Sequence, residues 1–166
     1  VNIKADLLKK GVKILSNEKV VDIDINDHLI TGVKTNKQTY QADEYILSAG
    51  SWTGLVAKKI GMNLLLQAGK GYRINVTRNT GISYPAILAE AKVAVTPMNG
   101  LTRFAGTMEI ARINQDLNGL RIDAIAKAAS NYYPDIEINK EEKLDASSGL
   151  RPLSPDGIPY IGRSSK

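Results

Sequence analysis

Apolar and polar residues alternate with a period of two along much of the first forty residues. Successive side chains of a strand point to opposite faces, so this pattern predicts short strands joined by tight turns. We expect the strands, which together form a small antiparallel meander, at residues 12–15, 21–25, 29–35 and 38–40. Ahead of them, Leu7 and Leu8 lie on the apolar side of a predicted helix over residues 3–10, which Gly11 ends.

The pattern changes between residues 45 and 61. Tyr45-Ile46-Leu47 is a short apolar run, which is typical of a buried strand. The small residues Ala49-Gly50-Ser51 follow and lead into a predicted helix over about residues 52–60, which Gly61 ends. Small residues leave the backbone bare, and a helix N-terminus favours anionic groups, so this turn suits contact with a cofactor. A tight strand-to-helix turn is the alternative explanation of the same residues.

Residues beyond Gly61 predict a larger antiparallel sheet with one helix. Alternation indicates strands at residues 72–76, 92–96 and 102–105, and Met98-Asn99-Gly100 is typical of a hairpin turn. Residues 120–132 predict an amphipathic helix, which Pro134 ends. Its apolar face carries Ile122, Ile125, Ala126 and Ala129.

The end of the chain, residues 147–165, is rich in glycine, proline and serine and predicts a structured loop. The chain therefore divides near residues 64–69, with mixed α/β structure before this point and an antiparallel sheet with a helix after it. The predicted fold class is α+β.

Composition narrows the range of functions. The chain has 166 residues, 43% hydrophobic and 23% charged, as in soluble globular proteins, and no apolar run approaches the roughly 20 residues of a membrane span. It has no cysteine and one histidine, His28, so we expect no disulfide, no metal site and no Ser-His-Asp triad. The net charge of +5 is scattered among acidic residues, whereas a nucleic-acid binder concentrates basic residues on one face. We therefore expect no nucleic-acid partner and no membrane span.

Four stretches of the chain, in order, match motifs of one enzyme family. They are Tyr45-Ile46-Leu47-Ser48-Ala49-Gly50-Ser51-Trp52, Gln67-Ala68-Gly69-Lys70-Gly71-Tyr72, Phe104-Ala105-Gly106-Thr107-Met108-Glu109, and the residues from Gly149 to Gly162. The last of these is similar to the pattern Gly-Leu-Arg-Pro-x-(Thr/Ser)-x-Asp-Gly-x-Pro-x-Ile-Gly. By these motifs the chain resembles the FAD-dependent D-amino-acid oxidase/dehydrogenase family, which includes glycine and sarcosine oxidases.

The resemblance implies part of an FAD-binding α/β domain plus an antiparallel-sheet substrate domain with a packed helix. Residues 1–66 would be the second part of the FAD-binding domain, residues 67–148 the substrate domain, and residues 149–166 a return segment to the first domain. The family's strand-GxGxxG-helix unit, which holds the FAD pyrophosphate, has no counterpart here, and family chains continue past the Ile-Gly motif. We therefore expect a fragment with a truncated return segment.

Members of the family oxidise an amine by passing hydride from the substrate α-carbon to the flavin. The resemblance thus implies FAD as the cofactor of the full-length protein, an amino-acid substrate, and no catalytic acid or base when the amine is neutral. It assigns Arg151 to the substrate carboxylate, and Met108 and Tyr72 to the substrate pocket. The cofactor-binding residues would be Val20 or Val21 near the adenine, together with Ala49, Gly50, Trp52, Gly149 and Leu150.

The chemistry of Arg151 agrees with its assigned role. Glycines and prolines stiffen the segment around it, and a guanidinium binds a carboxylate through two parallel hydrogen bonds. A rigid segment that presents one arginine is therefore a suitable carboxylate clamp. An exposed arginine on a proline-rich loop, without any ligand, is the alternative.

The parent enzyme is predicted to be a D-amino-acid dehydrogenase or oxidase. The alternatives are a relative that acts on glycine, sarcosine, another secondary amine or a hydroxy acid, and a non-enzymatic subunit or binding module. The electron acceptor stays open between oxygen, a quinone and a partner protein. We expect a cytoplasmic location, with the inner face of the membrane as the alternative.

We expect the chain on its own to be inactive and to bind FAD weakly, because the segment that holds the FAD pyrophosphate has no counterpart in it. The purified 166-residue chain should therefore be colourless. An absorption spectrum with one equivalent of bound yellow flavin would contradict this prediction.

Overall fold

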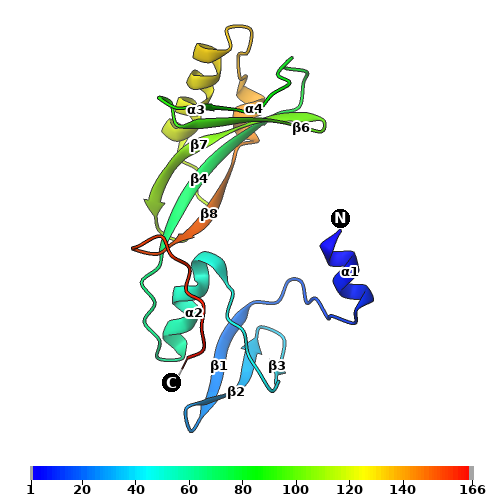
Figure 1. The fold of residues 1–166 in the computed structure, drawn as a ribbon, viewed down its shortest axis with the longest axis vertical. Helices are drawn as coiled ribbons and strands as arrows, with labels where there is room; N and C mark the ends of the chain where they lie inside the picture. The colour runs from blue at the N-terminus through cyan, green and yellow to red at the C-terminus, as the bar shows by residue number, and fades with distance from the viewer. Residues whose placement is uncertain (1, 165–166) are drawn as a thin grey trace. The chain divides into compact units, whose positions relative to one another are not determined.

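The computed structural model describes residues 2–164, which fall into two compact units (Figure 1). The first unit holds the chain up to Ser48, Leu55–Asn63 and the residues from Gly162 on. The second holds Ala49–Gly54 and Leu64–Ile161. The main division falls beside the boundary predicted after residue 66. Residues 149–161 group with the second unit, and the chain from Gly162 on groups with the first.

The first unit contains the antiparallel meander. Its strands pair in the order β1-β2-β3, with bounds Val20–Asn26 for β1, Leu29–Thr35 for β2 and Thr39–Tyr40 for β3. Asp27 and His28 join β1 to β2 with positive φ angles of 47° and 65°. Two consecutive residues of this kind are typical of a type I′ turn, whose twist matches that of the paired strands. The turn and the alternating pattern together explain why this hairpin could be predicted.

Short helices flank the meander along the chain. Their bounds are Ile3–Lys9 for α1, Gly50–Trp52 for the 3₁₀ helix η1 and Thr53–Lys59 for α2. Gly11 and Gly61, predicted as the stops of two helices, adopt positive φ angles of 81° and 72° just beyond α1 and α2. No helix within residues 2–164 is both long enough and apolar enough to cross a membrane.

Two strands predicted for the first unit are absent from the described residues. Residues 12–15 and 45–47 pair with no neighbouring strand, and Ile46 is 89% exposed. A strand is held by hydrogen bonds to a neighbour, so an apolar run without a paired edge remains irregular. The prediction of a buried strand at Tyr45-Ile46-Leu47 is therefore wrong for these residues.

The second unit is an antiparallel sheet of five strands in the order β5-β6-β7-β4-β8, with helices α3 and α4 (Figure 1). The strand bounds are Gln67–Val76 for β4, Ala86–Leu88 for β5, Val93–Met98 for β6, Leu101–Ala111 for β7 and Ser147–Leu153 for β8. The helices are α3 (Gly119–Tyr132) and α4 (Lys140–Leu144). Strand β4 has a partner on both edges, β7 on one and β8 on the other. The predicted antiparallel sheet and α+β class are confirmed.

The core of the second unit lies between the sheet and α3. Strand β4 contributes Tyr72, Ile74 and Val76, and β7 contributes Phe104, which is fully buried and meets the ring of Tyr133 edge-on at 6.4 Å between centroids. The helix contributes the predicted apolar face, namely Ile122, Ile125, Ala126 and Ala129. Burying a large apolar side chain is worth roughly 1.5–3 kcal/mol, so this layer carries most of the unit's stability.

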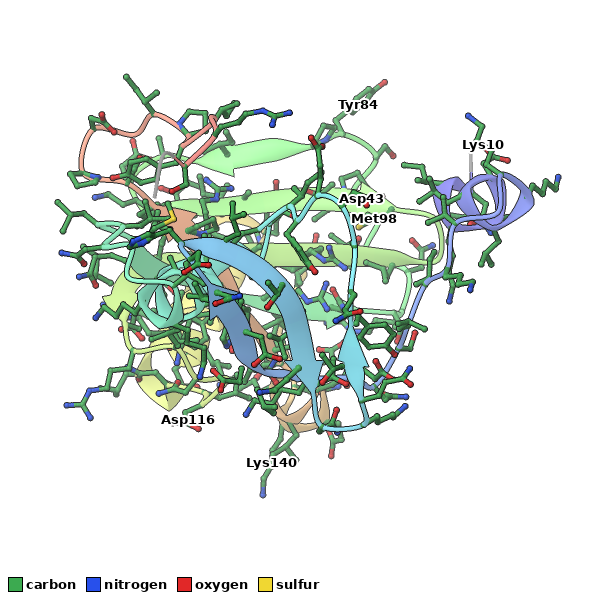
Figure 2. The ribbon with its side chains drawn as sticks, turned by 90° about the horizontal axis from the view of Figure 1, so that it is seen from below. Lys10, Asp43, Tyr84, Met98, Asp116 and Lys140 are labelled. Atoms are coloured by element: carbon green, nitrogen blue, oxygen red, sulfur yellow. The ribbon has the colours of Figure 1, made fainter. Side chains whose placement is uncertain are left out.

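Two elements were not predicted from the sequence. Residues 147–153, expected as part of a loop, form β8 along the free edge of β4, and Pro152 is tolerated because β8 is an edge strand of this sheet. Helix α4 begins with a capping box, in which Asn139 and Glu142 each accept a hydrogen bond from the other's backbone N–H. Its first residue, Lys140, points away from the ribbon (Figure 2).

Replacement of Phe104 tests the location of this core. Phe104→Ala should lower the free energy of unfolding by about 3–5 kcal/mol, because it empties a fully buried site. Ile110→Ala on the same strand is the matched control, since Ile110 is 72% exposed, and should change stability by no more than about 0.5 kcal/mol. Urea denaturation followed by circular dichroism measures both values. Equal effects of the two substitutions would contradict the assignment of the core.

Candidate functional site

The two faces of the second sheet differ in character because alternate side chains of β4 point to opposite sides. Tyr72, Ile74 and Val76 pack against α3, whereas Gly69, Gly71 and Arg73 lie on the other side. We call that second side the open face. Across the strands it continues on β7 with Arg103, Ala105, Met108 and Ile110, and on β8 with Ser147, Gly149, Arg151 and Leu153.

Arg151 lies on the open face beside a glycine that has no room for a side chain. It pairs with Gly69 across β4 and β8. A Cβ atom on Gly69 would lie 2.8 Å from Cδ1 of Leu153 and 3.0 Å from Sδ of Met108, both closer than real Cβ contacts allow. Met108 and Leu153 therefore lie directly over the backbone of Gly69. The structure thus brings together Arg151 and Met108, which the sequence assigned to the same site.

The guanidinium of Arg151 has no hydrogen bond or ion pair with any described residue, and the side chain is exposed. The five strands of the sheet contain one acidic residue, Glu109, and its carboxylate is on the α3 side, where it accepts a hydrogen bond from Tyr72. An arginine on a face without carboxylates keeps its full charge and both prongs of its fork available. Such a group is suited to bind a carboxylate from outside the chain.

A bulge in β7 places Met108 on the open face. The register between β4 and β7 shifts between Lys70 and Tyr72, so one extra residue is accommodated in β7 opposite Gly71. Without the shift, strict alternation from Phe104 would point Met108 toward α3 and Glu109 toward the open face. Thr107 carries the distortion, with a φ of 55° that is rare for a β-branched residue and a buried hydroxyl with no partner among the described residues.

Tyr72 lies on the α3 side and is 2% exposed, so the structure does not bring it to Arg151 and Met108. Its hydroxyl donates a hydrogen bond of 2.5 Å to Oε1 of Glu109, and Oε2 of Glu109 lies 3.4 Å from Nε of Arg121 on α3. Burial, and then the contact with Glu109, raises the pKa of Tyr72 to about 12. Its contacts are those of a residue that ties α3 to the sheet.

The turn before α2 offers bare backbone and an unsatisfied hydroxyl. Gly50 has a φ of 55°, and a Cβ atom there would meet nothing within 4 Å. Ser51 is 4% exposed, and its Oγ is buried with no hydrogen-bond partner among the described residues. Trp52, whose N–H bonds to the carbonyl of Ala49, is 44% exposed. An orphaned hydroxyl beside open backbone fits a segment that contacts a bound group, so Ala49, Gly50 and Trp52 remain candidates for cofactor contact, with Ser51 added.

The other predicted cofactor residues are distributed over both units. On β8, Gly149 is open, because an added Cβ would meet nothing within 4 Å, while Leu150 is half-buried and pairs with Lys70. Val20 and Val21 begin β1 of the first unit and are 37% and 43% exposed. Their assignment to the adenine end of FAD stays a prediction.

Lys70 holds one end of the sheet to the segment that leads into α3. It is 3% exposed, and its ammonium group donates to Oδ1 of Asn114 and, at 3.1 Å, to the carbonyl of Asp116. Buried ammonium groups must be hydrogen-bonded, so these neutral acceptors offset the cost of burial. Lys70 is therefore a structural residue of the α3 side, although it is flanked by the glycines of the open face.

The second unit is an α+β domain with helix α3 on one face of its sheet and, on the other, a guanidinium that pairs with no described residue and is suited to bind an anion. The turn at Gly50 and Ser51 adds a segment suited to contact a cofactor. The family model described as FAD dependent oxidoreductase matches residues 2–166, and the chain belongs to this family. The family predicted from the sequence is confirmed.

Individual relatives cover the chain almost completely. The D-amino acid dehydrogenase of Bradyrhizobium diazoefficiens is 31% identical over 155 residues, which are 92% of this chain and 36% of that protein. The solved glycine oxidase of Geobacillus kaustophilus matches with a TM-score of 0.77 at 20% identity, over 94% of this chain and 42% of that chain. The glycerol-3-phosphate dehydrogenase of Bacillus halodurans, solved with FAD, matches with a TM-score of 0.78 at 18% identity. The match covers 91% of this chain and 34% of that chain. The two structures show a shared fold, and the chain spans well under half the length of all three proteins.

The buried phenol of Tyr72 makes a testable contribution to stability. Because its pKa is about 12 in the native state and 10.0 when unperturbed, the neutral hydroxyl stabilises the fold fully below pH 10. This contribution is lost as the pH rises from 10 through 12. At pH 11 the native protein should lose on the order of 1 kcal/mol more, relative to pH 8, than Tyr72→Phe, which cannot ionise.

Urea denaturation at pH 8, 10 and 11 measures this difference. Tyr84→Phe is the matched control, since Tyr84 is 82% exposed, and it should follow the pH dependence of the native protein. If Tyr72→Phe and the native protein lost stability in parallel up to pH 11, the proposed state of Tyr72 would be wrong.

Proposed function

We propose that the whole protein oxidises D-amino acids, and that Arg151 binds the substrate α-carboxylate. One observation carries this proposal: Arg151 pairs with no described residue, lies on a sheet face without carboxylates, and is next to Gly69, over which Met108 and Leu153 pack. The similarity to a D-amino acid dehydrogenase supports the choice of substrate. The same arrangement suits any small substrate that carries a carboxylate, so the substrate class rests on that similarity.

The residues around Gly50 fit an FAD cofactor. Gly50 offers backbone without a side chain, the Oγ of Ser51 is a buried group in need of a partner, and Trp52 is a large, partly exposed apolar surface. We infer that these residues and Ala49 contact FAD, together with Gly149 and Leu150, and that Val20 or Val21 contacts its adenine. When bound, FAD would accept the hydrogen of the substrate α-carbon as a hydride, which carries both electrons of the oxidation.

The protein's own residues bind and orient the substrate. Arg151 holds the carboxylate by two parallel hydrogen bonds, which fix the direction of the α-carbon as well as its position. Met108 and Leu153 place apolar atoms over Gly69, beside this contact. The named open-face residues include no acid or base, and none is required of them when the substrate amine is neutral as it reacts.

Arg151→Lys tests the carboxylate contact in the whole protein. Lysine keeps the positive charge but loses the two-pronged geometry, so KM for D-amino acids should rise about ten- to a hundredfold. Turnover should also fall, because the α-carbon is no longer held in one direction. Steady-state kinetics and the flavin absorbance of the purified variant are measured together, and the flavin content should be unchanged.

Arg163→Lys is the matched control, because that side chain is 89% exposed and pairs with Glu44 on the surface of the first unit. It should leave both kinetic constants unchanged. An unaltered kcat/KM for Arg151→Lys would show that Arg151 is only a surface residue. A variant that loses its flavin would instead show that Arg151 maintains the structure of the cofactor site.

A further inference from the structure

The open face carries two more arginines, and each is oriented by a neutral side chain. Nε of Arg73 donates to Oγ of Ser147 at 2.7 Å, and Nε of Arg103 donates to Oδ1 of Asn75 at 3.0 Å. Neither guanidinium forms an ion pair with any described residue. Their terminal NH₂ groups remain unused, so both arginines are fixed in direction while their charge is not neutralised.

Three arginines elsewhere in the described chain are paired with carboxylates instead. Arg78, Arg121 and Arg163 each form an ion pair with a glutamate. The contrast matters because a neutral anchor orients a guanidinium without cancelling its field, whereas a carboxylate does both. The open face therefore keeps a positive potential, whereas the charge of each arginine that is paired with a glutamate is largely cancelled. This arrangement favours a ligand that brings its own negative charge.

Arg73 and Arg151 are separated by a strip of glycine backbone. Arg151 pairs with Gly69, Gly71 with Gly149, and Arg73 with Ser147, in this order across β4 and β8. A Cβ atom on Gly71 or on Gly149 would meet nothing within 4 Å, so the space above the middle pair is open. Arg73 lies beside Ser147, and positions 147 and 151 are four residues apart in β8. This separation corresponds to about 13 Å along the strand between the backbones of the two arginines.

We propose that Arg73, oriented by Ser147, is a second anion subsite, and that the substrates are amino acids with an acidic side chain. The inference rests on the proposed function, because Arg151 supplies the first subsite for the α-carboxylate. An extended five-carbon dicarboxylate has its carboxyl carbons about 5 Å apart. With one charge-assisted contact at each end, such a dicarboxylate would reach from one arginine to the other along this strip.

The positions of the neighbouring residues agree with this reach. Arg73 is the closer of the two additional arginines, since Arg103 pairs with Asn75, two residues further along β4. Arg103 therefore contributes to the positive potential and has no direct contact with the substrate. Ala105, which pairs with Arg73 on β7, is small and leaves the guanidinium accessible from that side.

The test compares D-glutamate with D-glutamine in the whole FAD-loaded protein, because the two have the same chain length and nearly the same shape, and only D-glutamate has a charged side chain. The native protein should favour D-glutamate by about ten- to a hundredfold in kcat/KM, the value of one charge-assisted contact. Arg73→Gln should remove this preference and leave kcat/KM for D-glutamine within about threefold of native. Arg73→Lys should retain part of the preference, because it keeps the charge.

Two further variants separate binding from folding. Ser147→Ala removes the anchor of Arg73 and should weaken D-glutamate selectively, by less than Arg73→Gln does. Arg163→Gln, at an 89% exposed arginine of the first unit, is the matched control and should change neither substrate. Equal losses for both substrates in Arg73→Gln, or a native protein without preference for D-glutamate, would overturn the subsite.

Equilibrium binding makes this result independent of turnover. Glutarate and pentanoate have the same chain length, and only glutarate can engage both arginines. Calorimetry on the native protein should show glutarate binding about ten- to a hundredfold more tightly, with the difference lost in Arg73→Gln. If no D-amino acid is oxidised but this difference holds, the proposed function fails and the dicarboxylate subsite stands. If D-glutamine is oxidised and the difference is absent, the subsite alone fails.

Discussion

The second unit depends on the pairing of β4 along both of its edges. A strand with two partners cannot rotate, so its alternate residues are committed to opposite sides of the sheet. The large apolar side chains of β4 meet α3 and form the core, while its glycines and Arg73 form the floor of the open face. In β4, side chains at even positions therefore face the core with α3, and those at odd positions face the proposed binding side.

The order of the strands in the sequence makes the site dependent on long-range contacts. Strand β8 lies next to β4 although about seventy residues separate them in the chain, and Arg151 reaches the open face only through this pairing. Arg73 and Ser147 come from the same two strands, as their hydrogen bond shows. A substitution that weakens the packing of α3 on the sheet would therefore also disturb the open face, because both faces share the same backbone.

Local patterns predicted those parts of the structure that are locally determined. The alternation in residues 29–35 and the turn at Asp27 and His28 were sufficient for β2 and its hairpin. The family motif around Arg151 was sufficient for the family and suggested the carboxylate contact. Strand β8 could not be predicted, because it contains Pro152 and pairs with glycines of β4, so it lacks the alternating apolar residues of a typical strand. The family resemblance grouped Tyr72 with Met108, but alternation places Tyr72 on the α3 side, and the bulge at Thr107 that places Met108 on the open face has no local signal in the sequence. Reading β4 from Gly69 onward with a period of two could have identified Arg73.

The extra residue in β7 decides which face of the sheet carries the negative charge of Glu109. If Thr107 were lost, Glu109 would move to the side of Arg151, and the chain would supply an internal carboxylate to its own anion site. Tyr72 would at the same time lose its acceptor in the core. The strained Thr107 thus keeps Glu109, the one acidic residue of the five strands, on the face opposite Arg151.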